Sequence, residues 1–417
     1  MPAPLYTGYV GIDWGSERHQ VCVLDGTGTP LGERAFEHSG PGLAALADWL
    51  LTVTGAPPAH LAVALEVPRG AVVETLVERG FAVFALNPKQ LDRFRDRYTV
   101  AGAKDDRRDA RVLGDALRTD RPAFRPVRPD DPHLVELREL SRLGDDLQEE
   151  LRRLANRLRD QLLRFHPQLL QLCPAADEPW LWTLLSHAPT PAQGQRLSLR
   201  AVARLLQTHR IRRLTPDAVR TALQCPPLSV QPGTVAAAVT HIGLLLPRLR
   251  LVHAQRRQLE RRIAAALDAV GTAEGVEGPR PEPRDVEILR SLPGIGNLVA
   301  ATLLGEAAQP LATRDYATVR ALAGAAPVTK QSGKHRVVAM RYACHQRLRQ
   351  AIYHWARVSV QCDERSQWHY RALRARGHNH ARALRGVADR LLSLLIAMLK
   401  TGTLYDPARR RAVTQTA

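Results

Sequence analysis

The chain has 417 residues, with 59 lysines and arginines against 41 aspartates and glutamates and a net charge of +18 at pH 7. Its hydrophobic share of 45% and charged share of 24% are typical of globular proteins and exclude wholesale disorder. No run approaches the ~18 apolar residues of a membrane span, and the N-terminus lacks a signal-peptide pattern. The 5 cysteines form no CxxC pair, which argues against a disulfide scaffold or a zinc ribbon. We therefore expect a cytoplasmic protein of roughly two or three domains, with no membrane partner.

The positive charge is concentrated near the C-terminus. Residues 1–120 carry 13 basic and 16 acidic side chains, whereas residues 311–417 carry 20 basic and 5 acidic ones. GC-rich coding explains most of the preference for Arg over Lys, but it does not explain a net charge. A segment this basic favours binding to a polyanion such as nucleic acid, because each neutralised phosphate releases counterions. The acidic first segment is suited instead to holding metal ions.

The first 132 residues predict an α/β domain. Strands and helices alternate in this stretch, and a turn at residues 26–28 favours a hairpin. Such alternation is typical of a sheet covered by helices. The predicted elements are a strand and hairpin at 8–37, a helix at 41–54, a buried strand at 60–67, a helix at 71–80, a strand at 81–88, a helix at 104–118 and a proline-rich connector at 122–132.

Two long amphipathic helices are predicted in the middle of the chain. Leucines recur at three- and four-residue spacing between charged residues over 133–172, and a second such stretch covers 234–269. The two helices either pair as an antiparallel hairpin or dimerise, so we expect a coiled-coil connector over residues 133–270. Residues 173–232 are less regular, and the Gly-, Pro- and Glu-rich residues 271–283 predict a linker.

The C-terminal region, residues 284–406 before a tail at 407–417, predicts a mainly helical domain. Its L-P-G-I-G sequence includes Gly294 and Gly296 and lies between two helical stretches, which is the pattern of a helix–hairpin–helix. The amides of the second helix would then donate hydrogen bonds to a phosphate. An ordinary turn between helices is the alternative. Further Arg-rich helices are predicted at 347–360 and 371–402, the latter with a polar helix N-terminus at residues 378–380.

Four carboxylates of the first domain predict a metal site. Asp13 lies near the end of the first strand, Glu66 ends the buried strand, and Asp106 and Asp109 share one face of a helix because they are three residues apart. Four anions brought together need a cation, and hard oxygen ligands suit Mg²⁺ in phosphoryl transfer. Each residue alone is more often a solvated carboxylate, and G-x-D-x-G also occurs in sugar-kinase-like ATPases. The prediction therefore rests on all four in their order along the chain.

A serine in the basic region is a candidate nucleophile. Ser332 lies in K-Q-S-G-K-H-R, where Gly333 permits a sharp turn and Lys330, Lys334 and Arg336 supply positive charge. A serine among cations can attack a phosphodiester and hold the DNA as a phosphoserine ester. By itself, S-G-K is only a flexible basic loop.

Together these residues resemble the transposases of the insertion-sequence 110 family, also called DEDD transposases or bridge-RNA-guided recombinases. The resemblance covers most of the chain and rests on G-I-D-W-G, the glutamate of A-L-E-V-P, K-x-D-x-x-D-A, P-G-I-G and Q-S-G-K, in that order. It implies a ribonuclease-H-like (RuvC-like) N-terminal domain, a coiled-coil connector and a C-terminal transposase domain. It also implies that Asp13, Glu66, Asp106 and Asp109 are the metal ligands and that Ser332 is the nucleophile.

The resemblance further implies the partners and the setting of the protein. These are donor and target DNA, a noncoding bridge RNA that pairs with both, a dimer that assembles into a tetramer with a composite site from two protomers, and the bacterial cytoplasm at the nucleoid. We expect nucleic-acid contacts from Lys330, Lys334, Arg336, Arg341, Arg347, Gly294 and Gly296.

This sequence departs from the family pattern at two places. The third motif reads Lys104-Asp105-Asp106 where the family has Lys-Thr-Asp, so Asp105 competes as a ligand, although the D-x-x-D spacing favours Asp106. The stretch after the serine lacks its usual glycine and reads Met-Arg-Tyr-Ala-Cys over residues 340–344. The loop geometry beyond Ser332 is therefore left open.

Two other functions remain as alternatives to a serine-dependent transposase. A hydrolytic RuvC-like nuclease, such as a junction resolvase, needs the carboxylates but not Ser332. A non-catalytic nucleic-acid-binding scaffold needs neither.

Overall fold

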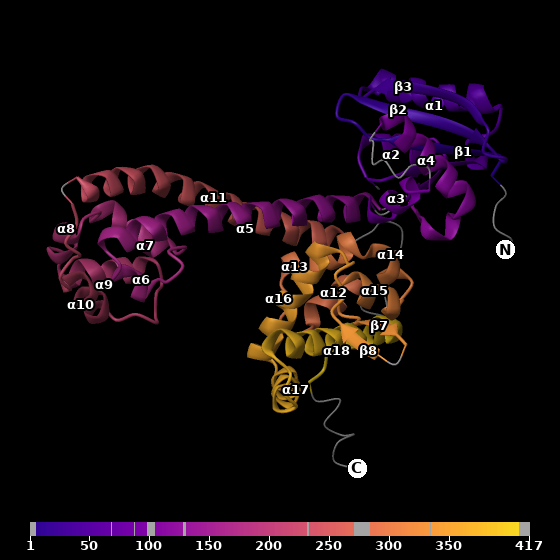
Figure 1. Ribbon diagram of the computed structural model, residues 1–417. Helices are drawn as coiled ribbons and strands as arrows, with labels where there is room; N and C mark the ends of the chain where they lie inside the picture. Colours follow the sequence, from indigo (N-terminus) through magenta and orange to yellow (C-terminus); the bar gives the residue numbers. More distant parts are fainter. Residues whose placement is uncertain are drawn as a thin grey trace, which may run out of the picture. The chain divides into compact units, whose positions relative to one another are not determined.

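A computed structural model describes residues 6–67, 69–86, 88–97, 105–127, 131–231, 233–270, 284–333 and 335–407. The chain divides into two compact units, Met1–Asp130 and Asp131–Ala417, referred to below as the N-terminal and C-terminal units. The first is a mixed α/β structure and the second is mainly helical (Figure 1). This order of fold classes confirms the coarse prediction from sequence.

The N-terminal unit contains a six-stranded sheet in the order β3-β2-β1-β4-β5-β6. Strand β1 pairs antiparallel with β2 and parallel with β4, which is parallel to β5. The central strands β1 and β4 therefore end at the same edge of the sheet. The strands are β1 (Gly8–Asp13), β2 (Arg18–Asp25), β3 (Pro30–Glu37), β4 (Leu61–Leu65), β5 (Ala82–Ala85) and β6 (Arg125–Pro126).

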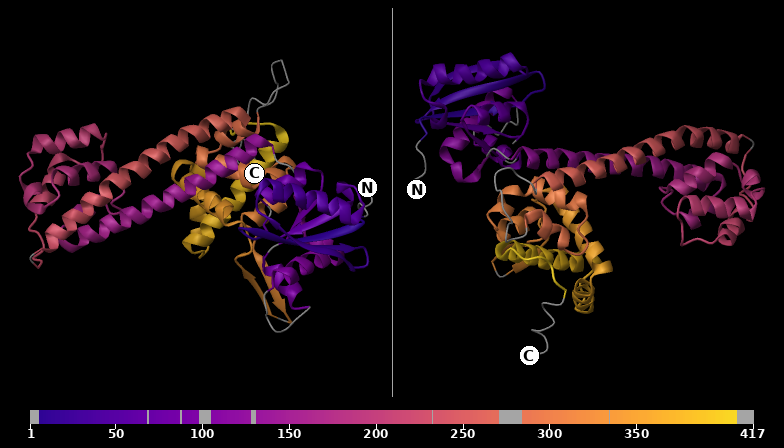
Figure 2. Two further views of the ribbon diagram at one scale, coloured as in Figure 1. Left: turned by 90° about the horizontal axis from the view of Figure 1, so that it is seen from above. Right: turned by 180° about the vertical axis from the view of Figure 1, so that it is seen from behind.

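Helices cover both faces of this sheet (Figures 1 and 2). Side chains alternate between the faces, so Val10 and Ile12 of β1 pack in one core with α1 and α2, whereas Ala62 and Ala64 of β4 pack in the other with α3 and α4. The helices are α1 (Gly40–Thr54), α2 (Ala71–Glu78), α3 (Pro88–Arg95) and α4 (Asp106–Thr119).

Helix α4 approaches β1 unusually closely at Gly11. A Cβ atom at Gly11 would lie 1.8 Å from the carbonyl oxygen of Ala110 and 2.5 Å from the amide nitrogen of Gly114. Only a glycine permits this contact, because any side chain would overlap the helix backbone. The contact holds the start of α4 near the end of β1.

The C-terminal unit contains fourteen described helices and a two-stranded hairpin. They are α5 (Pro132–Phe165), α6 (Leu169–Leu172), α7 (Pro179–His187), α8 (Pro191–Gln195), α9 (Leu199–Thr208), α10 (Pro216–Gln224), α11 (Thr234–Val270), α12 (Asp285–Ser291), α13 (Asn297–Glu306), α14 (Ala308–Ala312), α15 (Tyr316–Leu322), β7 (Val328–Ser332), β8 (His335–Ala339), α16 (Gln346–Cys362), α17 (Glu364–Ala375) and α18 (His380–Thr401).

The two long helices α5 and α11 lie side by side and run antiparallel (Figures 1 and 2). The first half of α5 and the last half of α11 share a core with α12–α18, while their other halves share a second core with α6, α7, α9 and α10. Of the two arrangements left open by the sequence, the antiparallel hairpin is therefore the one observed. Its description as a coiled coil stays a prediction.

Ion pairs fix α5 to the C-terminal helices. The guanidinium of Arg142 donates to both carboxylate oxygens of Glu306 at 2.8 and 3.1 Å. Arg347 of α16 reaches Asp145 of α5 at 2.8 Å. Burial raises the pKa of Glu306, but the hydrogen bond and charge of Arg142 and the charge of His345 outweigh burial and lower it.

Several element boundaries differ from the sequence prediction. The helix predicted over 133–172 ends at Phe165, and the one predicted over 371–402 is two helices separated by Gly377, which has a positive φ of 80°. Asn379 caps α18 as expected for a polar helix N-terminus, since its side chain accepts from the amide of Arg382 at 2.9 Å. Helix α3, strand β6 and the β7–β8 hairpin were not predicted, and the less regular stretch 173–232 contains α7–α10.

The helix α11 is the one described helix that is long and apolar enough to cross a membrane, with an 18-residue window of mean hydropathy 1.5. The expectation from sequence considered only continuous apolar runs and did not single out this helix. A core helix has the same composition, and Leu245, Leu246 and Leu249 of α11 do pack in a core. Its apolar character is weak evidence for a membrane span.

Candidate active site

The first two carboxylates of the predicted site lie at neighbouring strand ends. Asp13 is the last residue of β1, and the register pairs Ile12 with Leu65, so Glu66 follows at the same level on the next strand. Ile12 and Leu65 both face the α1–α2 core. By alternation, Asp13 and Glu66 therefore face α4. Parallel pairing is what brings these two residues, which are far apart in sequence, to one edge of the sheet.

The other two carboxylates come from the first turn of α4. Asp105 caps the helix, and its side chain accepts a hydrogen bond from the amide of Arg107 at 3.3 Å. Asp106 and Asp109 follow inside the first turn, where the helix dipole favours negative charge. Asp106 is exposed, whereas Asp109 is buried. The capping bond gives Asp105 a structural role, which supports the choice of Asp106 as the ligand.

The four carboxylates act on one another electrostatically. Burial raises the pKa of Asp13 from 3.8 to about 6, and the charges of Asp109, Asp106 and Glu66 add to the rise. The charge of Arg95 opposes it. Asp109, Asp106 and Glu66 are thus close enough to act electrostatically on Asp13, although no three of these four described carboxylates bring a ligand atom each within 4.8 Å of the others.

Arg95, at the end of α3, is the resident counter-charge of this site. Its Nε and Nη2 donate to the two oxygens of Asp109 at 2.6 and 2.7 Å, and its Nη1 donates to Asp92 at 2.7 Å. Burial lowers the pKa of Arg95, but the bonds and charges of Asp109, Asp92 and Glu66 outweigh burial and raise it. Sequence reasoning missed this residue, because nothing distinguishes it from the other arginines between α3 and α4.

The donor set fits a divalent metal. All four side chains offer carboxylate oxygens, which are the ligands that Mg²⁺ prefers. The pKa of Asp13 is raised first by burial and then by the charges of the other three carboxylates. Arg95 supplies one positive charge to four carboxylates, so a cation would be favoured here. Asp13, Glu66, Asp106 and Asp109 would hold it.

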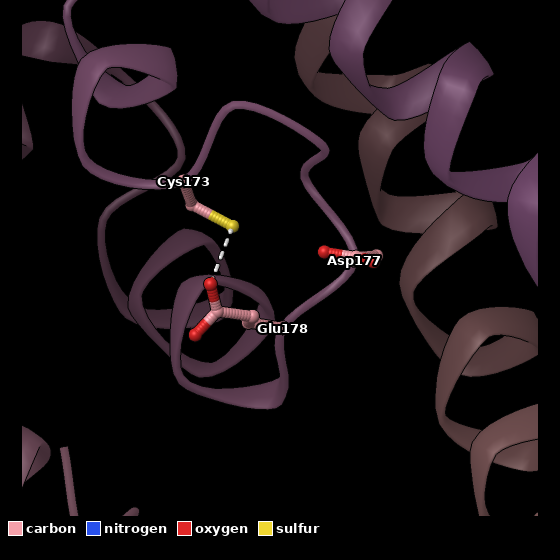
Figure 3. A group of neighbouring side chains, drawn as sticks. All are labelled: Cys173, Asp177 and Glu178. Atoms are coloured by element: carbon pink, nitrogen blue, oxygen red, sulfur yellow. Dashed lines mark hydrogen bonds between the residues drawn. The ribbon is translucent and has the colours of Figure 1, made fainter. Parts of the chain in front are cut away.

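Another group of potential metal ligands is more closely spaced than the four carboxylates. In the described part of the chain, only Cys173, Asp177 and Glu178 bring one ligand atom each within 4.8 Å of the others (Figure 3). The thiol of Cys173 donates to one carboxylate oxygen of Glu178 at 3.5 Å, and the indole of Trp180 donates to the other oxygen of Glu178 at 3.0 Å. Arg213 also pairs with Glu178, and burial raises the pKa of Cys173 to about 11. This group is therefore explained as an internal hydrogen-bond network.

Ser332 lies at the tip of the β7–β8 hairpin. It is the last residue of β7, its register partner is His335, and Gly333 in the turn has a positive φ of 55°. Ser332 and its described neighbours Lys330 and Arg336 are exposed. The hairpin thus presents a hydroxyl to solvent among cations, on a regular strand instead of the flexible loop weighed as the alternative. Lys334, predicted to contact nucleic acid, lies outside the described residues.

The remaining predicted nucleic-acid contacts lie in varied surroundings. Arg347 is engaged by Asp145, as described above, and by Asp146 at 3.4 Å. The Nε of Arg341 is buried without a hydrogen-bond partner. Gly294 has a positive φ of 81° and packs on α16, where a Cβ would lie 2.7 Å from the backbone nitrogen of Ser359. Gly296 caps α13 and faces open space.

Comparison with known proteins gives consistent matches along the chain. Residues 10–167 match a family model for the DEDD domain of IS110 elements, described as "Transposase", and residues 286–371 match the "Transposase IS116/IS110/IS902 family". The first region contains the four carboxylates and the second contains Ser332.

Similar proteins extend the match to nearly the full length. The chain is 50% identical to the putative transposase y4uE of Sinorhizobium fredii, over 54% of this chain and 62% of that protein. It is 32% identical to the mini-circle putative transposase for IS117 of Streptomyces coelicolor, over 97% of this chain and 96% of the relative. A 43.6 kDa protein of insertion element IS110 from the same organism is 30% identical over 95% of each. The chain belongs to the IS110 family of transposases.

Proposed function

We propose that this chain cuts and rejoins the DNA of an insertion sequence through a phosphoserine intermediate on Ser332, assisted by Mg²⁺ at the carboxylate site. The observation that carries the proposal is that Asp13 at the end of β1 is acted on electrostatically by Glu66, Asp106 and Asp109, which follow β4 and begin α4. With metal bound, the same site can stabilise charge on the phosphate oxygens.

The strand order supports a ribonuclease-H-like fold for the N-terminal unit. An antiparallel β3-β2-β1 ribbon continues into the parallel strands β4 and β5, and the carboxylates lie at the ends of the central strands and on α4. In open sheets with parallel strands, sites form at the carboxyl ends of those strands. The site therefore lies where this architecture places its ligands.

In the proposed reaction, the Oγ of Ser332 attacks a phosphodiester and the bond to one deoxyribose oxygen breaks. The hydroxyl proton passes to water as the new Oγ–P bond forms, and the departing deoxyribose oxygen takes up a proton from water. Lys330 and Arg336 beside Ser332 lower the energy of the charged transition state. Mg²⁺, held by the carboxylates, would supply Lewis-acid stabilisation of the attacking and leaving oxygens.

The proposed partners follow from the family and the charge distribution. They are donor and target DNA, a noncoding guide RNA, and further copies of the chain in a dimer or tetramer. A net charge of +15 over residues 311–417 supports binding to nucleic acid in the bacterial cytoplasm. The helix–hairpin–helix assignment of α12 and α13 belongs to this proposal, with the amide at Gly296 as the open phosphate contact.

The test is a search for a protein–DNA adduct that survives denaturation. The full-length protein is incubated with element-end DNA, the flanking noncoding RNA and Mg²⁺. We expect the adduct with the wild-type chain, none with Ser332→Ala, and an undiminished yield with Thr329→Ala, which removes another exposed hydroxyl from the same strand. Free DNA ends without an adduct would instead favour the hydrolytic nuclease. Activity independent of Asp13 and Asp109 would contradict the metal-site proposal.

A further inference from the structure

Four arginines gather where the chain leaves strand β8. Arg349 of α16 donates to the backbone carbonyls of Arg341 and Tyr342, the latter at 3.4 Å. Arg385 of α18 donates to the sulfur of Met340 at 3.0 Å. Arg382 precedes Arg385 by one turn on the same helix. The segment that follows the Ser332 hairpin is thus held between two helices by guanidinium groups. We refer to Arg341, Arg349, Arg382 and Arg385 as the arginine cluster.

The arginine cluster lacks negative charge. Among the residues that the structure describes, no carboxylate lies within ion-pair distance of any of its four guanidinium groups, whereas many other arginines of the C-terminal unit have one. Burial and the charges of Arg382 and Arg349 lower the pKa of Arg385, although arginine keeps its proton. Like charges held together without counter-charge raise the energy of the protein unless an anion binds.

Hydrogen-bonding capacity in the cluster is also incompletely used. Within the described residues, the buried Nε of Arg341 has no hydrogen-bond partner, and the acceptor of Arg385 is a thioether, which is weak. Arg382 belongs to the first turn of α18, which contains no acidic residue. A cation is disfavoured there by the helix dipole, whereas an anion would be favoured. Three independent features, charge, free donors and dipole, therefore point to an anionic ligand.

We propose that the arginine cluster binds the phosphodiester backbone of the DNA strand that Ser332 attacks. The inference deepens the proposed function, on which it rests, by assigning the grip on that strand to residues outside the serine hairpin. A phosphate is the anion that matches several converging guanidinium groups, because they donate paired hydrogen bonds to its oxygens.

The hairpin geometry sets the spacing of the two sites. Ser332 is at the turn end of the hairpin, and β8 runs from His335 back to Ala339, directly before the cluster. Five strand residues span roughly 16 Å. The cluster would therefore hold the backbone a few nucleotides from the attacked phosphate. Tyr342 is 73% exposed beside the cluster and offers a ring face to a base of the same strand.

The test measures how salt weakens DNA binding by the full-length chain. Fluorescence anisotropy with a labelled element-end duplex gives Kd at several salt concentrations for the wild type and for Arg382→Gln/Arg385→Gln. We expect the slope of log affinity against log salt to fall by about 2 in the double variant, because each lost phosphate contact removes roughly 0.9. At moderate salt we expect Kd to weaken about tenfold or more.

Two control variants show whether an effect of Arg382→Gln/Arg385→Gln comes from lost phosphate contacts or from a general loss of positive charge. Arg262→Gln/Arg290→Gln removes the same charge from arginines that already pair with Glu136 and Asp268, so its slope should stay near the wild-type value. Arg382→Lys/Arg385→Lys keeps the charge and should retain most of the slope. Thermal melting of every variant reports damage to the fold.

The possible results distinguish this inference from the broader function. An unchanged slope in the double glutamine variant, while the wild type binds DNA, overturns the inference alone. If the double glutamine variant loses affinity for an RNA hairpin but binds the DNA duplex like the wild type, the inference is also overturned. Absence of salt-sensitive DNA binding by the wild type contradicts the proposed function as well.

Discussion

The carboxylate site and the serine hairpin are built in opposite ways. The carboxylates extend from the ends of buried strands and from a helix that contacts the sheet backbone, so their positions depend on the core of the N-terminal unit. Ser332 lies on a two-stranded ribbon whose residues are almost all exposed. The difference fits the proposed roles, because metal ligands need a fixed geometry, whereas a nucleophile must be accessible to its substrate. Substitutions around the carboxylates should therefore reduce stability, whereas substitutions in the hairpin should reduce activity with little effect on stability.

The largest expected effect is at Gly11, where the core sets the site. In Gly11→Val the side chain would overlap the backbone of α4, since even a Cβ would lie 1.8 Å from the carbonyl oxygen of Ala110. We expect the N-terminal unit to lose about 4 kcal/mol or more and to lose metal binding with it. Urea unfolding followed by circular dichroism measures the loss. A chain that unfolds like the wild type would contradict the tight contact of α4 with β1.

The next effect concerns Arg95, the counter-charge of the site. Arg95→Met leaves buried Asp109 without its two hydrogen bonds, so the metal-free chain should lose about 2–3 kcal/mol. Mn²⁺ should then raise the melting temperature by more than it does in the wild type, because the ion replaces the missing charge. Arg97→Met is the matched control, since Arg97 pairs with Asp120 in a more exposed setting. Equal metal-induced shifts in the wild type and Arg95→Met would show that Arg95 does not compete with the ion.

A smaller effect links Asp13 to pH. Its pKa in the fold is raised to about 6, so the folded state binds this proton more tightly than the unfolded state does. Its unfavourable contribution therefore grows from about pH 4 to about pH 6 and is complete above that range. Asp13→Asn should stabilise the metal-free chain by about 1 kcal/mol at pH 8, a value reduced for the half-exposed position, and have no effect at pH 4. Melting curves at both pH values, with a metal chelator, test this difference. A stabilisation equal at both pH values would contradict the shift.

The smallest effect on stability is expected in the hairpin. Gly333→Ala places a side chain at a φ of 55° but in open space, so it should cost no more than about 1 kcal/mol and leave the global melting temperature unchanged. The yield of the Ser332–DNA adduct should nevertheless fall, because the turn positions the hydroxyl. An adduct yield at the wild-type level would show that the turn geometry is not needed for attack.

The sequence was sufficient to predict which strands and which helix carry the four carboxylates, but not that Arg95 pairs with one of them. Period-two alternation and the D-x-x-D spacing place acidic residues at strand ends and on one helix face, and these local rules hold in the fold. The bond from Arg95 to Asp109 joins two helices across residues with no pattern of their own, and so it depends on tertiary packing. The β7–β8 hairpin was missed for a related reason. Its strands are too polar to show alternation, since both faces are exposed.

Helix boundaries failed where a single residue ended a periodic pattern. Leucine spacing continues past Phe165, but His166 leaves the helical conformation and Pro167 follows, so α5 ends seven residues before the leucines do. Burial also varies along these helices, since Trp368 of α17 is 68% exposed, whereas Trp355 of α16 is fully buried and donates to the carbonyl of Pro293 at 3.0 Å. Residue type alone does not separate these two tryptophans, because their burial is decided by which face of a helix they occupy.

The antiparallel pairing of α5 and α11 restricts how insertions and deletions can be tolerated. Helix α5 has 34 residues and is about 50 Å long, and its partner shares a separate core with it at each end. One extra residue in α5 would turn everything beyond it by about 100° and move its leucines out of phase with those of α11. The spacing between the two cores can therefore change only in paired steps of about seven residues in both helices. Among relatives, we therefore expect α5 and α11 to differ in length by about seven residues at a time, whereas the loops can differ by any number.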